Sequence, residues 1–249
     1  MDKITIAYIS DVHLTDVPTN ETNKRIQLLN QVEADYLIMA GDICNNRYVM
    51  YMFDKIHPKV KKIIIVKGNH EYYHNDINYE VVYPPHVVCL RAGKPFVDGS
   101  VAFIGDTLWT YVPGHKMSYI ERFMNDYAVI ANDDYELTCE DTNDLHEKQK
   151  SQLLVDCYEH PDKQIVVVTH HSPSYNGLSP KFAGHPANCA FHSDTIELFS
   201  DIENIKVWVH GHTHDEIDYK HKNIDVLCNP AGYLRERDSF EIKYFEIGA

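Results

Sequence analysis

Two histidines, His212 and His214, stand one residue apart just beyond an apolar run, Ile205 to Val209. In an extended segment, residues two apart point the same way, so both imidazoles would leave the end of a rigid strand toward one place. Such a pair is a typical presentation of metal ligands. A polar turn that happens to contain histidines explains the same letters, and this motif alone does not decide between the two interpretations.

Other apolar runs of the chain end in side chains of the same kind. The polar residues at their ends are Asp11 and His13, Asp42, Asn69 and His70, and His170 and His171. Oxygen and imidazole ligands without cysteine suit manganese, iron, zinc or nickel, and they exclude a thiolate-rich structural zinc site. So many ligands are too many for one ion with an open position, but they suit two ions that share a carboxylate and hold a hydroxide between them.

The charge of such a site indicates its substrate. Two divalent ions carry more positive charge than the carboxylates of Asp11 and Asp42 cancel. The remaining positive charge favours hydroxide and an anionic group such as phosphate. Metal binding can lower the pKa of water from about 15.7 to about 7, which supplies a nucleophile at neutral pH.

The elements that must position these residues are strands alternating with helices. Apolar runs at 4–13, 36–46 and 62–71 read as strands, and the apolar spacing at 23–33 and 48–56 predicts helices. This order is the βαβαβ pattern of a mostly parallel sheet. In such sheets a ligand site lies beyond the carboxyl ends of the strands, which is where the polar residues fall.

The rest of the chain is less regular. Strands are predicted at 87–93 and 101–109, separated by a turn at Asp98 and Gly99, then at 164–173, with a closing pair at 225–233 and 239–247. The polar segment 113–160 has helix-like pieces at 118–127 and 144–158; it is interpreted as a flap or insertion over the active site, or equally as a solvated helical excursion. No linker is evident, so we expect a single domain over 1–249.

Composition limits the class of protein. An apolar share of 44% and a charged share of 24% are typical of soluble globular chains. No run reaches the roughly 18 to 20 apolar residues of a membrane span, and the acidic N-terminus does not resemble a signal peptide. Six cysteines without CxxC spacing indicate reduced thiols. We therefore expect a cytoplasmic protein with no membrane partner.

The net charge of -14 argues against a long duplex nucleic acid as partner, because such a field repels a phosphate backbone at long range. A local site can still bind phosphate. The prediction is a small phosphorylated substrate, with a nucleotide as one candidate; the oligomeric state is left open.

Five motifs in a fixed order carry a resemblance to a known family. They are Asp11-Val12-His13, Gly41-Asp42, Gly68-Asn69-His70-Glu71, His170-His171-Ser172-Pro173 and Gly211-His212-Thr213-His214. Together they resemble the calcineurin-like metallophosphoesterase superfamily. Segments at 124–127 (MNDY) and 229–233 (NPAGY) are similar to small bacterial and phage-type members. The resemblance implies an α/β fold, a four-layer α/β/β/α sandwich of two mixed sheets flanked by helices.

The resemblance also implies roles. One divalent ion would be held by Asp11, His13, Asp42 and His214, and the other by Asp42, Asn69, His170 and His212, with manganese the first choice and iron, zinc or nickel possible. His70 would be catalytic, contacting the phosphate and protonating the leaving group. An H-H-P-P form of the motif favours His170 as the ligand and an H-x-P form favours His171; we take His170. The implied reaction is hydrolysis of a phosphomonoester or phosphodiester by a hydroxide that bridges the ions.

Two rival interpretations remain. The run from His70 to His74 matches HExxH of zinc proteases, which requires one helix to carry both histidines, yet a β-like run leads straight into it. A catalytically silent metal-binding scaffold on the same fold would be expected to have lost ligands, and none is lost. Tyr72 and Tyr73 are interpreted as wall or core aromatics, and His210 as a residue that could orient a ligand.

Overall fold

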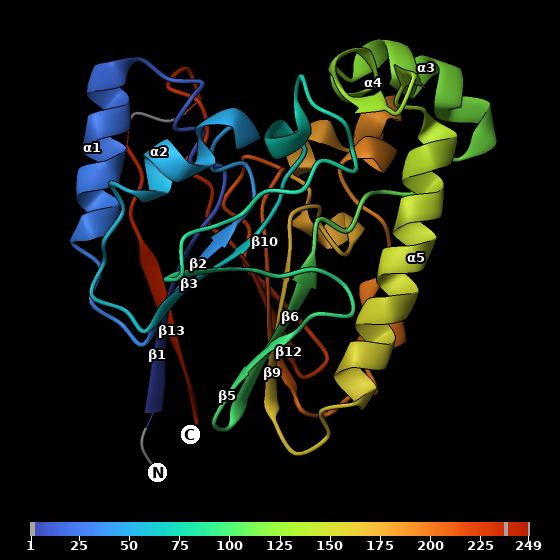
Figure 1. Cartoon of the computed structure of the whole chain (residues 1–249). Helices are drawn as coiled ribbons and strands as arrows, with labels where there is room; N and C mark the ends of the chain where they lie inside the picture. The colour runs from blue at the N-terminus through green and yellow to red at the C-terminus, as the bar shows by residue number, and fades with distance from the viewer. Residues whose placement is uncertain (1–2, 237–238, 249) are drawn as a thin grey trace.

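The computed structural model describes residues 3–236 and 239–248. Two β-sheets face each other at its centre; α1 and α2 cover the outer face of one sheet, and α5 covers that of the other (Figure 1). The predicted four-layer sandwich of two mixed sheets is confirmed.

The first sheet has the strand order β13-β1-β2-β3-β4. Its strands are β13 (Lys243–Gly248), β1 (Lys3–Ile9), β2 (Tyr36–Ala40), β3 (Lys62–Val66) and β4 (Val87–Cys89). β1 to β4 run parallel, as the βαβαβ pattern predicted, and β13 adds an antiparallel edge to β1.

The second sheet has the order β11-β12-β10-β9-β6-β5. It contains β11 (Tyr219–His221), β12 (Ile224–Cys228), β10 (Ile205–His210), β9 (Gln164–Thr169), β6 (Val101–Asp106) and β5 (Phe96–Asp98). The four central strands are parallel, and β5 and β11 are antiparallel edges. The turn at Gly99 therefore joins β5 to β6, whereas β4 lies in the other sheet. The predicted closing pair of strands is also wrong, because β12 and β13 lie in different sheets and do not pair with each other.

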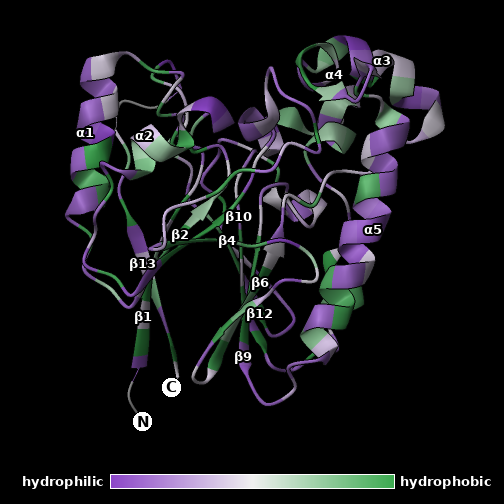
Figure 2. Cartoon of the chain, in the orientation of Figure 1, coloured by the Kyte–Doolittle hydropathy of each residue, from purple (hydrophilic) through white to green (hydrophobic). Residues whose placement is uncertain are grey.

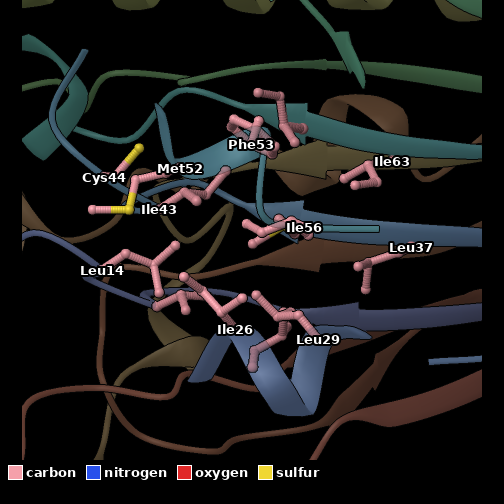
Figure 3. Close-up of a cluster of buried hydrophobic side chains, with 14 of the residues drawn as sticks. Leu14, Ile26, Leu29, Leu37, Ile43, Cys44, Met52, Phe53, Ile56 and Ile63 are labelled. Carbon is pink, nitrogen blue, oxygen red and sulfur yellow. The ribbon is translucent and has the colours of Figure 1, made fainter. Parts of the chain in front are cut away.

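Alternation along the central strands builds the layers. In β2, the side chains of Tyr36 and Ile38 lie between the two sheets, while those of Leu37 and Met39 face the helices. Because successive side chains of a strand point to opposite faces, a strand that is apolar throughout can be buried on both. Figure 3 shows the cluster on the helix side, to which Leu37 of β2 and Ile26 and Leu29 of the covering helix belong.

The helices are α1 (Thr19–Asn30), α2 (Val49–Phe53), α3 (Met117–Phe123), α4 (Asp126–Val129) and α5 (Cys139–Tyr158). Short 3-10 turns occupy Asn46–Tyr48, His70–Tyr72, Gly114–Lys116, Tyr175–Gly177, Pro180–Phe182, Pro186–Ala190 and Ile196–Phe199. Figure 2 shows hydrophobic residues along the central strands and a mixture of hydrophobic and hydrophilic residues in α1 and α5. No helix in the described ranges is both long and apolar enough to cross a membrane.

The segment 113–160 divides into two parts. α3, α4 and the hairpin of β7 (Ala131–Asn132) with β8 (Tyr135–Glu136) lie at one end of the sandwich, and α5 runs back along the second sheet (Figure 1). The first part buries its own apolar residues, among them Ile120, Tyr127 and Ile130. It is therefore packed against the molecule, in contrast to a solvated excursion.

Candidate metal centre

The predicted site residues follow five parallel strands of both sheets. Asp11 and His13 come after β1, Asp42 after β2, Asn69 and His70 after β3, His170 after β9, and His212 and His214 after β10. Backbone bonds tie these loops together: the His13 amide donates to the Asp42 carbonyl at 2.9 Å, and the Gly211 amide to the His170 carbonyl at 2.9 Å. The ends of strands far apart in the sequence thus meet at one edge.

A first group joins Asp11, His13, Asp42 and His214, whose ligand atoms all lie within 4.8 Å of one another. His214 Nε2 is 3.3 Å from Asp11 Oδ1 and 3.1 Å from His13 Nε2. Burial by itself would raise the pKa of the Asp11 carboxyl. The imidazoles that face this carboxylate outweigh burial, so the pKa of Asp11 is lowered. These are the four residues that the resemblance assigned to one ion.

A second group joins Asp42, His170 and His212 in the same way. His170 Nε2 lies 3.4 Å from Asp42 Oδ2 and 3.1 Å from Asn69 Oδ1, so the amide oxygen is turned into the group. His212 Nε2 is buried and has no hydrogen-bond partner among the described residues. A buried nitrogen without a partner is costly, and a cation would satisfy it. Asp42 belongs to both groups, as a bridging carboxylate must.

The structure brings His170, and not His171, into the second group. The ring of His171 packs beside those of His212 and Trp109, and its Nδ1 lies 3.3 Å from the Thr107 carbonyl oxygen. Burial and the neighbouring His170 lower the pKa of His171 to about 3, so it is held as a neutral side chain. The sequence left this choice open, because two adjacent residues differ only in the face they present.

The backbone around the ligands differs from the extended form expected for His212 and His214. Positive φ angles occur at Asp11 (53°), His13 (46°), Asp42 (52°), His212 (66°) and His214 (52°). Left-handed conformations of such residues cost about 1–3 kcal/mol each and gather at functional sites. His212 and His214 belong to different groups, and these groups meet at the shared Asp42.

His70 lies beside the first group without belonging to either set. Its Nδ1 donates to Asp16 Oδ2 at 3.0 Å, and its Nε2 lies 3.1 Å from the Tyr233 hydroxyl and 3.9 Å from Asp42 Oδ2. Burial lowers the pKa of His70, but the carboxylates of Asp42 and Asp16 outweigh it and raise the pKa to about 9. The His70 imidazole therefore lies beside the candidate metal centre, with carboxylates that favour its protonated form.

A family model described as calcineurin-like phosphoesterase matches residues 4–216. The chain belongs to this family. A protein of Acanthamoeba polyphaga mimivirus named "Uncharacterized protein L509" is 27% identical over 94% of this chain and 93% of its own length. The predicted family is thereby confirmed.

Solved structures of the same fold are more distant in sequence. Phosphopantetheinyl hydrolase from Mycobacterium tuberculosis has a TM-score of 0.71 at 15% identity, over 97% of this chain and 95% of its own. A dimetal phosphatase from Danio rerio has a TM-score of 0.55 at 12% identity, over 97% and 91%. The protein TT1561 of Thermus thermophilus has a TM-score of 0.57 at 14% identity, over 99% of both chains. At such low sequence identities these similarities establish the fold of the chain alone.

Sequence analysis missed residues that contact the candidate ligands and His70 from outside. Asp16 Oδ2 accepts from His13 Nδ1 at 3.1 Å as well as from His70, and Glu236 Oε2 lies 2.7 Å from His214 Nδ1. The Tyr233 ring stacks on His13 with a centroid distance of 4.4 Å. A carboxylate on Nδ1 leaves Nε2 of a histidine free for a metal.

Tyr73, which the sequence analysis interpreted as a wall aromatic, stacks on the His70 ring with a centroid distance of 4.2 Å. Nothing in the spacing of these residues points to such contacts.

Glu71 ties the Asp42 loop to the Asn69 loop. Its buried carboxylate accepts the backbone amides of Asp42, Ile43, Cys44 and Gly68 at 2.6–3.1 Å. Burial and the charge of Asp42 raise the pKa of Glu71 to about 7. With its carboxylate oxygens directed at backbone amides, Glu71 acts as a structural clamp under the candidate metal centre.

The protease alternative is wrong. The segment forms one 3-10 turn, His70–Tyr72, after which Tyr73 is extended and His74 has a φ of 60°. The two histidines of the motif therefore do not lie one turn apart on a helix, as zinc binding by HExxH requires.

His210 was interpreted as a residue that could orient a ligand. Its Nδ1 contacts the Gly211 carbonyl oxygen, and this bond orients no candidate ligand side chain.

Glycine at position 68 lets the two loops approach. A Cβ at this position would lie 2.1 Å from Asp42 Oδ1. We expect Gly68→Ala to displace the Asp42 carboxylate and lower the Mn²⁺ affinity of the protein at least tenfold, measured by isothermal titration calorimetry. Gly114→Ala is the matched control, because a Cβ there meets nothing within 4 Å. Equal affinity of both variants would contradict this role for Gly68.

Proposed function

We propose that this family member hydrolyses phosphoesters with two divalent cations, one held by Asp11, His13, Asp42 and His214 and the other by Asp42, Asn69, His170 and His212. The observation that carries the proposal is the pair of buried ligand groups that share Asp42, with His70 beside them. The donor set fits, since it contains only imidazole and oxygen atoms and includes the His212 Nε2, for which the described residues offer no hydrogen-bond partner. Mn²⁺ is the first candidate, and Fe, Zn and Ni suit the same donors.

When bound, the two ions would supply a hydroxide at neutral pH and positive charge against the phosphate. The chain itself would supply the proton. Because His70 Nδ1 is engaged by Asp16, its Nε2, which faces the Tyr233 hydroxyl at 3.1 Å, is the nitrogen that would act as general acid toward the leaving-group oxygen. The hydrogen bond of Nε2 to Tyr233 shows that a hydroxyl oxygen fits at that position. His70 then regains a proton from solvent.

We further propose a small, nucleotide-like substrate. A hollow of about 310 Å³ is lined by Asp16, Val17, Pro18, Tyr233, Leu234 and Arg235. Asp16 and Tyr233 belong to its wall, and both hydrogen-bond the His70 imidazole, so the hollow adjoins the proposed acid. The acidic net charge supports a small ligand over a long duplex. A cytoplasmic location is supported by six free cysteines.

The test is release of nitrophenol from p-nitrophenyl phosphate and bis-p-nitrophenyl phosphate by protein loaded with Mn²⁺. We expect turnover of at least one of them and its loss after chelation, and comparing the two separates monoesterase from diesterase. A protein that binds two ions and turns over neither compound would instead be the silent scaffold. A panel of nucleotides then defines the substrate.

Asp16 gives a pH-dependent prediction. Its carboxylate helps to raise the pKa of His70, and an acid works only while protonated, so activity falls as the pH rises through that pKa. Asp16→Asn is expected to lower this pKa and move the alkaline limb of the kcat profile to lower pH. An alkaline limb at unchanged pH would contradict the pairing of Asp16 with His70.

A further inference from the structure

The side chain of Asn69 can serve as a ligand in only one of its two orientations. The amide oxygen has lone pairs to give, whereas the amide nitrogen has only hydrogens to donate. The two ends have nearly the same shape, so packing alone selects poorly between them. A hydrogen bond from a polar neighbour is therefore needed to select which end of the amide faces His170 and Asp42.

That neighbour is Asp126, the first residue of α4. Asn69 Nδ2 donates to Asp126 Oδ1 at 2.7 Å and to the Tyr73 hydroxyl at 3.2 Å. An ionised carboxylate only accepts hydrogen bonds, so it holds the NH₂ end of Asn69. Asn69 Oδ1 is left 3.1 Å from His170 Nε2, inside the second ligand group.

α4 cannot drift from this place without breaking backbone bonds. The His74 amide donates to the Val129 carbonyl at 2.8 Å, and the Ala131 amide to the Asn75 carbonyl at 3.0 Å. Asp126 itself is only 3% exposed. Burying a carboxylate is costly unless its hydrogen bonds are made, and here the bonds come from the segment that carries Asn69.

We propose that Asp126 is a positioning residue for the second cation, acting through the Asn69 amide. The proposal rests on the two-ion site of the proposed function. It gives the first part of segment 113–160 a role in metal binding, as a brace that reaches the ligand loop from a separate part of the chain.

The first experiment measures Mn²⁺ binding to the metal-free protein by isothermal titration calorimetry. Wild type should bind two ions, and Asp126→Ala should weaken one of them about 10- to 100-fold, the loss typical of removing such an outer partner. Asp126→Asn should stay close to wild type, because its carbonyl still accepts from Asn69. Asp134→Ala is the control, an exposed acid of the same segment. If Asp126→Ala fails to fold, Asp126→Leu, of similar shape, replaces it.

The second experiment separates orientation from general loosening. In an Asn69→Asp background, both ends of residue 69 are oxygens, so nothing needs to orient it. Asp126→Ala should then cost no Mn²⁺ affinity, and the two changes should be strongly non-additive. An equal loss in both backgrounds, or no loss in either, overturns the proposal. Wild type that binds fewer than two ions would instead contradict the proposed two-ion function.

Discussion

Replacing His70 with alanine is expected to lower kcat for phosphoester hydrolysis by about 10²- to 10⁴-fold, the usual contribution of a general acid. The protein should still fold and bind two Mn²⁺ ions, because His70 belongs to neither ligand group that shares Asp42. Steady-state kinetics with p-nitrophenyl phosphate or its diester measures the loss, and calorimetry measures the ions.

The matched control is His74→Asn in the same short segment. His74 is exposed and has a left-handed backbone, a conformation that asparagine tolerates. We expect it to keep nearly full activity. His70→Ala with wild-type turnover would show that another group protonates the leaving group, while leaving the two-ion site intact.

Asp42→Asn is expected to remove both ions together. The resulting loss of kcat should be at least as large as that of His70→Ala. Asp42 Oδ2 lies 3.4 Å from His170 Nε2 and 3.8 Å from His13 Nε2, so one carboxylate serves both groups. Facing imidazoles outweigh the effect of burial and hold the pKa of Asp42 well below its usual range, so it stays ionised at neutral pH. An amide has no charge to share between two cations.

Metal content after dialysis against Mn²⁺ measures this effect, with Asp54→Asn, an exposed acid, as control. The comparison with Asp11→Asn is informative, since Asp11 belongs to the first group only. Asp11→Asn should spare one ion. If Asp42→Asn retains one tightly bound ion, Asp42 does not bridge two cations.

The sequence by itself determined the family, the parallel core of the first sheet and the set of candidate ligands. These features are local: a fully apolar run ending in glycine and a ligand predicts both a buried strand and the place of its polar end. The order of the five motifs then carried the resemblance, although no motif alone was specific.

Only the tertiary structure brought His170, in place of His171, into a candidate ligand group, placed β4 and β6 in different sheets, and revealed the contacts of Asp16, Tyr233 and Asp126. The physical reason is that these features depend on contacts between segments distant in the chain. Asp126 meets Asn69 from 57 positions away and Tyr233 meets His70 from 163 positions away, and no periodicity links such pairs. The left-handed turns at the ligands follow from the same cause, because the strain is sustained by the packed loops around each residue.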